Sequence, residues 1–140
     1  MKLFRKEITL KERSRGFHLI TDEINSAIGT ADGINDGIAN IFIQHTSAGL
    51  TINENADPSV RRDFETFFDR LVPEDTSLYE HTTEGPDDMT SHIKSSQMGS
   101  SLTIPFSGGR LLMGTWQGIF LCEFRNRPHR RKIIISIMGE

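Results

Sequence analysis

Two apolar segments near the end of the chain, residues 118–124 (GIFLCEF) and 132–138 (KIIISIM), decide how the fold is read. Both are rich in the β-branched and aromatic residues that favour strands. We therefore predict two core strands, joined as a hairpin across a basic loop. The second segment is apolar on both faces, so either the protein's own core or a subunit interface has to cover its second face.

Outward from these segments, hydrophobic alternation and turn residues predict further strands and a few helices. The additional strands are expected at residues 3–10, 17–20, 38–45, 50–54, 101–106 and 110–114, with 46–49 as a turn that returns 50–54 beside 38–45. Helices are expected at 22–28 with Thr21 as the cap, from the Asp57 cap through Pro58 to Pro73, and from Asp87 or Asp88 to near Gly99. The fold class is α+β, with a largely antiparallel sheet and two or three inserted helices.

The overall composition bounds the classes of protein to which this chain can correspond. Its 140 residues suit one domain, 1–140, without repeats or a linker. It contains neither an apolar run of about 18 residues nor an apolar signal-type segment after Met1. The single cysteine, Cys122, favours a reducing cytoplasm, and it alternates with apolar residues as a buried structural thiol would. A net charge of −3 argues against a general nucleic-acid binder.

Two residues in the 38–54 region combine polar chemistry with core-facing positions. His45 has the strand parity of Ile41 and Ile43, and this predicts either a hydrogen-bonded core histidine or an imidazole at a pocket rim. Glu54 has the parity of Leu50, so its carboxylate leans toward the core and needs a partner or a metal. We count both residues as candidate catalytic groups.

Two more histidines lie beside a run of acidic residues. Residues 73–88 contain six acids and no lysine or arginine, and His81 lies among them. His92 faces inward from the helix that follows. Together with His45, these histidines could bind zinc or a similar divalent ion and leave one position open. Alternatively, Asp87 and Asp88 could hold Mg²⁺, or could simply cap the helix.

A basic segment, residues 125–132, follows the first of the two core strands. As a group, its arginines suit a solvated loop. Arg125 is the best candidate for gripping a phosphate or pyrophosphate, because it leaves a buried strand and arginine binds such oxygens bidentately. Trp116 could stack on a flat ring, although a place in the core is the more common role of tryptophan.

Four segments resemble the YjbQ family, an uncharacterised-protein family also described as secondary thiamine-phosphate synthase enzymes. The segments are RGFHLITDEI (15–24), HTSAGLTINENADPSVRRD (45–63), YEHTTEGPDDMTSHIKSSQMGSSLTIP (79–105) and GGRLLMGTWQGIFLCEF (108–124). The Gly-Thr-Trp-Gln block at 114–117 is the most specific of the matches, and the resemblance covers nearly the whole chain.

This resemblance implies a homotrimer and a cleft lined by the His-Thr-Ser, Asn-Glu-Asn and Asp-Asp…His segments. It also implies an ability to join a hydroxymethylpyrimidine pyrophosphate to a thiazole phosphate. Carried over by position, the candidate residues are His45, Glu54, His81 and His92 for catalysis, and Thr46, Ser47, Asn53, Asp88, Gln117 and Arg125 for substrate binding. The chain departs from the family where Phe124 replaces a common histidine, where residues 128–130 replace a Gly-Gly-Ser loop, and where Thr90 replaces a common proline.

Several functions remain open from these residues. The first is a metal-assisted transferase that makes thiamine phosphate as a main or side activity, and the second is a metal-dependent hydrolase of a phosphorylated small molecule. The third is a non-catalytic trimer that binds such a molecule. Nucleic-acid binding through residues 125–132 ranks last, because aromatic residues are not interleaved with the basic ones.

Overall fold

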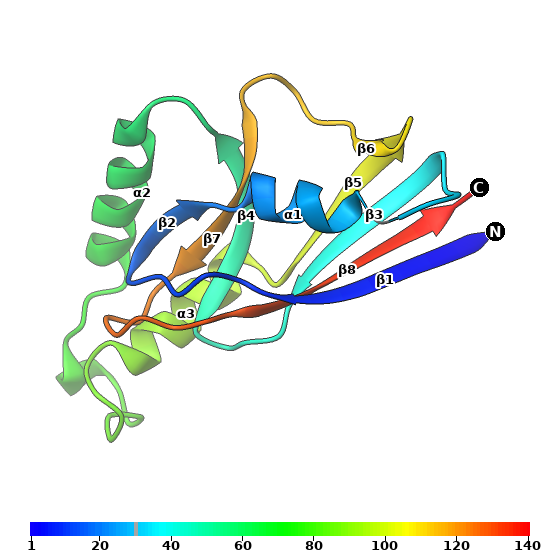
Figure 1. Ribbon diagram of the computed structural model, residues 1–140. Helices are drawn as coiled ribbons and strands as arrows, with labels where there is room; N and C mark the ends of the chain where they lie inside the picture. The colour runs from blue at the N-terminus through cyan, green and yellow to red at the C-terminus, as the bar shows by residue number, and fades with distance from the viewer. Residues whose placement is uncertain (30) are drawn as a thin grey trace.

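The computed structural model describes residues 1–29 and 31–140 (Figure 1). The strands are β1 (Lys2–Thr9), β2 (Gly16–Leu19), β3 (Asp36–Ile43), β4 (Ala48–Glu54), β5 (Ser101–Ser107), β6 (Arg110–Leu111), β7 (Gln117–Glu123) and β8 (Lys132–Gly139). The helices are α1 (Thr21–Ile28), α2 (Pro58–Leu71), the 3₁₀ turn η1 (Thr76–Leu78) and α3 (Asp88–Met98). The turn residues of TADGINDG (30–37) predict a loop, and its first residue, Thr30, lies outside the described residues.

The strands form two antiparallel sheets that enclose one main core, which confirms the predicted α+β class. One sheet has the order β1-β8-β3-β5-β6 and the other has the order β2-β7-β4. Isoleucines of β3 and β8 face leucines of β4 and β7 in this core, and α1 packs its buried Ile24 into it. The two termini lie at the same end of the molecule, and α2 lies at the opposite end (Figure 1).

Two predicted hairpins are wrong, because each pair of neighbouring segments is divided between the sheets. The predicted strand 38–45 became β3 in the larger sheet, and the predicted 50–54 became β4 in the smaller one. In the same way, β7 pairs with β2 and β4, whereas β8 pairs with β1 and β3. A chain that crosses between sheets lets both apolar segments bury a face against the same core.

The helix boundaries follow the sequence signals, but of the predicted side-chain caps only that of α2 forms. Asp57 caps α2 as predicted, and its Oδ1 accepts a hydrogen bond of 2.8 Å from the Ser59 N–H. Thr21 is not a cap: it is the first residue of α1, and its Oγ1 accepts the Ile119 N–H at 3.0 Å. The hydroxyl therefore satisfies a strand N–H in β7 where a capping role was expected.

The surface departs from the sequence prediction at Trp116, whose expected core position is wrong because it is 65% exposed. Cys122 is buried as predicted, and burial raises the pKa of its thiol. On β8, Ile133, Ile135 and Ile137 fill the core, while the opposite face of the strand remains accessible.

Across residues 1–29 and 31–140, no helix is long and apolar enough to cross a membrane.

Candidate functional site

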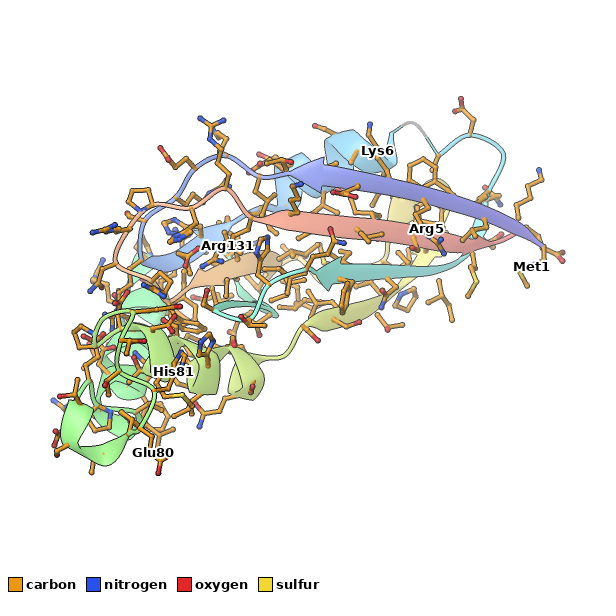
Figure 2. The ribbon with its side chains drawn as sticks, turned by 90° about the horizontal axis from the view of Figure 1, so that it is seen from below. Met1, Arg5, Lys6, Glu80, His81 and Arg131 are labelled. Atoms are coloured by element: carbon orange, nitrogen blue, oxygen red, sulfur yellow. The ribbon has the colours of Figure 1, made fainter. Side chains whose placement is uncertain are left out.

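A histidine–aspartate cluster forms where the acidic segment meets α3. Asp88 is the first residue of α3, His92 follows one turn later on the same face, and His81 approaches from the preceding loop. One nitrogen of each imidazole and one Asp88 oxygen all lie within 4.8 Å of one another. In Figure 2, His81 lies at the end of the molecule opposite Met1. Two imidazoles and one carboxylate therefore converge on one point, which we call the α3 cluster (His81, Asp88 and His92).

The carboxylate at the centre of the α3 cluster is buried and ionised. Asp88 Oδ2 lies 2.7 Å from His81 Nε2 and 3.2 Å from His92 Nε2, and Oδ1 accepts a hydrogen bond from Arg125. Burial alone would raise the pKa of Asp88. The His81 hydrogen bond and the charges of His92 and Arg125 outweigh burial and hold this pKa below its ordinary value. A metal ligand in this position needs no deprotonation at neutral pH.

The hydrogen bond between His92 and the Thr46 carbonyl fixes the tautomer of the neutral imidazole. It therefore determines which ring nitrogen carries the lone pair. His92 Nδ1 lies 2.8 Å from the Thr46 carbonyl oxygen, which can only accept, so Nδ1 donates. In a neutral imidazole, Nε2 then carries a lone pair and points at an Asp88 oxygen, which is also an acceptor. Two acceptors at 3.2 Å need a proton or a cation between them. A carbonyl behind the ligating imidazole is the usual support of a metal-bound histidine.

A second layer of charge holds Asp88 in place. Arg125 uses its Nε for Asp87 Oδ2 at 3.0 Å, its NH1 for Asp88 Oδ1, and its NH2 for the Glu84 carbonyl at 3.0 Å. The Asn126 N–H also donates to Asp87 Oδ2, at 2.9 Å. Burial raises the pKa of Asp87, but this backbone hydrogen bond and Arg125 lower it by more. Arg125 therefore positions the two carboxylates, and a substrate phosphate would have to compete with them for it.

The predicted three-histidine metal set needs a correction at His45. Its Nε2 accepts the Lys132 N–H at 2.8 Å, so that lone pair is already used, and His45 is not a member of the α3 cluster. Burial and the positive charge of Arg131 lower the pKa of His45. Asp88, which the sequence analysis placed among the substrate-binding candidates, takes the position that had been assigned to His45.

The neighbours of His45 have different roles. Thr46 contributes its carbonyl to the α3 cluster, as described above. Ser47 is buried, and its Oγ accepts a 3.0 Å hydrogen bond from Arg131. Arg131 in turn pairs bidentately with the fully buried Glu123, with both nitrogen–oxygen distances at 2.6 Å. Ser47 thus belongs to a closed buried ion pair, which we call the β7–β8 ion pair (Glu123, Arg131 and Ser47).

Three other candidates lie at the opposite end of β7 from the α3 cluster. Asn53 is paired with Gly118 and Glu54 with Gln117, at the start of β7, whereas Arg125 follows its end. At about 3.3 Å per residue, the seven residues of β7 separate these two positions by roughly 20 Å. The structure therefore does not bring Asn53, Glu54 and Gln117 together with the histidines.

Two of these three side chains accept a hydrogen bond from a nearby backbone N–H. The Gln117 side-chain oxygen accepts the Gly114 N–H at 2.8 Å, and the Asn53 side-chain oxygen accepts the Glu54 N–H at 2.7 Å. Glu54 is half-buried, and its Oε2 has no hydrogen-bond partner among residues 1–29 and 31–140. Its expected lean toward the interior is confirmed, whereas a catalytic role for it stays a prediction.

Sequence reasoning missed the supporting roles of the Thr46 carbonyl and of Asp87. The first has no sequence signal, because any residue could supply that carbonyl. The i, i+4 spacing of Asp88 and His92 is a signal that could have identified the pair, since residues four apart share one face of a helix. Asp87 was expected to cap the helix or to bind Mg²⁺, and it instead anchors Arg125 and Asn126.

Comparisons with known proteins show close relatives along the whole chain. The model of the family described as UPF0047 protein YjbQ-like matches residues 6–140. The UPF0047 protein YjbQ of Escherichia coli O157:H7 is 52% identical over 98% of this chain and 99% of that protein. A YbjQ-like protein of unknown function from Sulfolobus solfataricus is 26% identical, with a TM-score of 0.87 over 99% of each chain. An uncharacterized conserved protein from Clostridium acetobutylicum is 38% identical, with a TM-score of 0.78 over 99% of this chain and 100% of that one.

Proposed function

This chain belongs to the YjbQ-like UPF0047 family, and we propose that its α3 cluster binds a divalent metal ion that assists chemistry on a phosphorylated small molecule. The observation that carries the proposal is the orientation of His92, whose Nε2 lone pair faces an Asp88 oxygen while Nδ1 is held by the Thr46 carbonyl. A bound cation removes the conflict between the two acceptors. We assign the protein to the reducing cytoplasm, in keeping with its free, buried Cys122.

The donor set favours zinc or another transition metal over magnesium. Mg²⁺ prefers oxygen ligands in octahedral geometry, whereas imidazole nitrogens suit zinc and its first-row neighbours. His81, Asp88 and His92 provide three protein ligands, which leaves a position for water or substrate, as catalytic sites do. His81 is 48% exposed in its side chain, so a ligand can approach the site from solvent.

The reaction that fits best is the transfer implied by the sequence resemblance. The bond between the pyrimidine methylene carbon and the pyrophosphate oxygen breaks, and the pyrophosphate leaves with the electron pair. The thiazole nitrogen forms the new bond to that carbon. His81, Asp88 and His92 would hold the metal ion, which would supply Lewis-acid stabilisation of the charge that develops on pyrophosphate. Arg125 keeps Asp88 ionised as a ligand, and His81 is the ligand on the solvent-exposed side of the site.

The proposed function is tested by metal content and pyrophosphate release. We expect the purified protein to bind zinc stoichiometrically and to release pyrophosphate when both the pyrimidine pyrophosphate and the thiazole phosphate are supplied. Asp88→Asn should lose both properties. Asp75→Asn is the matched control, because Asp75 is an exposed acid of the same segment that caps η1. Release by Asp88→Asn at the wild-type rate, or no release by the metal-loaded protein, would contradict the transferase.

Hydrolysis of a phosphorylated small molecule is the second candidate, favoured by the solvent exposure of His81 beside an open metal position. This reaction needs one substrate and water, so phosphate release from a panel of phosphate esters distinguishes it from the transferase. If the metal-loaded protein binds a phosphorylated ligand saturably without turning it over, the third function, a ligand-binding protein, takes the place of both.

We also propose that three copies associate through the outer face of the five-stranded sheet. The strand registers place Leu3, Met138, Ile38 and Pro105 side by side on neighbouring strands, and Leu112 follows beside Pro105. Leu3, Ile38 and Met138 are each more than half exposed. An exposed apolar row across a whole sheet favours an interface. Light scattering on the wild type and on Ile38→Asp tests it, and an unchanged mass in the variant would contradict it.

A further inference from the structure

Trp116 lies on the surface, on a turn that hydrogen bonds hold in place. It is the only tryptophan of the chain, and its side chain is mostly exposed. Asn55 donates its backbone N–H to the Trp116 carbonyl at 2.9 Å. The Asn55 side-chain Nδ2 donates to the carbonyls of Thr115 and Gln117, at 3.2 and 3.3 Å. We call residues 114–117 the Trp116 turn; it presents a large flat ring on a backbone that needs no further ordering when a ligand binds.

The register of the smaller sheet places the indole on the same face as the Asn55 side chain. The pairing of β4 with β7 extends to Glu54 and Gln117, and the Asn55 N–H bond to the Trp116 carbonyl continues it by one pair. Directly opposite residues of an antiparallel ladder have their side chains on one face. A Cβ at Gly118, two residues after Trp116, would lie 2.9 Å from the Asn55 Cβ, as expected of neighbours on that face.

A cavity of about 390 Å³ lies beside this turn, between the chain that follows β1 and the start of α1. Lys11, Asp22 and Asn55 are among the residues that line it, and we call it the α1 cavity. In Figure 1 the orange connection from β6 into β7 comes down beside the first turn of α1, where a hydrogen bond joins the two elements. Small-molecule sites have volumes of about 300–1,000 Å³. The α1 cavity therefore has the size of a ligand site, with the Trp116 turn at its rim.

The charges that line the α1 cavity balance each other. Arg13 and Glu23, both in the lining, are paired with one another. The other two charged groups are the Lys11 ammonium and the Asp22 carboxylate, and neither has a hydrogen-bond or ion-pair partner within residues 1–29 and 31–140. One unpaired donor and one unpaired acceptor of opposite charge suit a ligand that carries no net charge and has both acceptor and donor groups.

We propose that the α1 cavity binds a nucleoside, with the base stacked on the Trp116 indole and the ribose hydroxyls donating to the Asp22 carboxylate. An aromatic side chain can stack on any base, because every base has a π-face. In dinucleotide sites an acidic side chain likewise accepts a hydrogen bond from a ribose hydroxyl. The Asn55 side-chain oxygen can accept from an amino group of the base, since its amide nitrogen is used on the Trp116 turn. The balanced charges favour a nucleoside over its phosphate.

This site is separate from the α3 cluster. Trp116 precedes the first residue of β7, whereas Arg125, which holds Asp88, follows the last. The seven residues of β7 put roughly 20 Å between these positions, at about 3.3 Å per residue. The nucleoside site therefore does not depend on the metal or on the proposed transfer reaction, and it can be tested in the metal-free protein.

The fluorescence of the protein reports on this site directly, because Trp116 is its only tryptophan. Adenosine is the probe, titrated into the chelator-treated protein with excitation at the red edge of indole absorption, where adenosine does not absorb. We expect saturable quenching by adenosine, and weaker binding of adenine and of ribose, each of which supplies half of the contacts. Asp88→Asn should bind adenosine as the wild type does, because Asp88 belongs to the α3 cluster.

Two variants assign the contacts, with adenosine affinity measured by calorimetry and folding checked by circular dichroism. Trp116→Ala should weaken binding at least about fivefold, the low end of the loss of a stacking aromatic. Asp22→Asn should weaken it at least about tenfold, because a charged hydrogen-bond acceptor is lost. The wild type should bind 2′,3′-dideoxyadenosine as weakly, and Asp22→Asn should not weaken that binding further. Asp63→Asn is the matched control, since Asp63 is an exposed acid of α2.

Four results would overturn the proposal. The first is the lack of saturable quenching by adenosine, and the second is tighter binding of adenosine monophosphate than of adenosine, which would assign the cavity to an anion. The third is an assembly mass that falls in Trp116→Ala, which would assign the indole to a contact between subunits. The fourth is loss of adenosine binding in Asp88→Asn, which would move the site to the α3 cluster.

Discussion

The protein contains two polar clusters built on the same plan, and the contrast between them separates structure from function. In the β7–β8 ion pair, Arg131 grips Glu123 with two nitrogens and donates to Ser47, so every charge has its partner. Beside the α3 cluster, Arg125 pairs with Asp87 and Asp88 in a similar way, but two imidazole nitrogens of the cluster also face one Asp88 oxygen. A closed polar cluster holds the fold together, whereas the convergence of two imidazoles on one carboxylate is where we propose a ligand.

Breaking the closed cluster should give the largest effect on stability. Arg131→Met leaves the fully buried Glu123 without its charge partner, so we expect a loss of about 3–5 kcal/mol in unfolding free energy. The double variant Glu123→Met/Arg131→Met should recover most of this loss, because no charge remains buried. Urea unfolding measures both. If the single variant is as stable as the wild type, the ion pair does not stabilise the fold.

Breaking the open cluster should affect ligand binding more than folding. His92→Gln removes one proposed ligand from a partly exposed position. Loss of a residue that only supports a metal ligand lowers metal affinity by up to about 100-fold, so we expect loss of a ligand itself to lower it at least that much. The unfolding midpoint of the metal-free protein should change little. His129→Gln is the control, since His129 contacts the Arg127 carbonyl on the basic loop. Equal zinc affinities for the two variants would show that His92 is not a ligand.

A smaller effect should come from the hydroxyl that shares an acceptor with His92. Ser95 Oγ donates to the Thr46 carbonyl at 2.8 Å, beside His92 Nδ1. Ser95→Ala removes one hydrogen bond, so we expect a loss of about 0.5–1.5 kcal/mol in stability. Metal affinity should stay within tenfold of the wild-type value, because the carbonyl still holds the imidazole. A larger loss of affinity would mean that the hydroxyl itself orients His92.

The smallest expected effect is a difference in pH dependence between His45, which lies beside the β7–β8 ion pair, and Asp88 of the α3 cluster. The pKa of His45, beside Arg131, is lowered by burial, so the unfolded chain takes up its proton at a higher pH than the folded chain. Stability from this residue is complete above its ordinary pKa of 6.5 and falls as the pH drops below that value. The lowered pKa of Asp88 gives a contribution present above its ordinary 3.8 and lost only below it.

Urea midpoints at pH values above and below 6.5 separate these contributions. Between 6.5 and 3.8 the wild type should lose stability relative to His45→Gln, whereas the contribution of Asp88 stays constant there. A His45→Gln variant with the same pH dependence as the wild type would contradict the assignment.

Local signals predicted the elements of this fold well. Asp57 and Pro58 marked the start of α2, and the Asp87-Asp88 pair marked the start of α3. The run of β-branched and other apolar residues within 132–138 predicted β8 to within one residue. These signals act over a few residues, through caps, turns and side-chain parity, and can therefore be read without knowledge of the fold.

The candidate site was predicted less completely. His81, Asp88, His92 and Arg125 were all named, and all four lie together in the structure. His45 was placed with them because the sequence shows residue types but not the hydrogen-bond partner that each nitrogen faces. Asn53, Glu54 and Gln117 were grouped with the same site, although the length of β7 separates them from it.

The sequence by itself determined that this is a single α+β domain, where its helices begin, and which residue types could bind a metal or a phosphorylated molecule. Only the tertiary structure decided that β3 and β4, and likewise β7 and β8, belong to different sheets. It also decided that the Thr46 carbonyl orients His92 toward Asp88. Strand partners and hydrogen-bond partners distant in the chain are chosen by the packing of the whole core, and no local pattern specifies that packing.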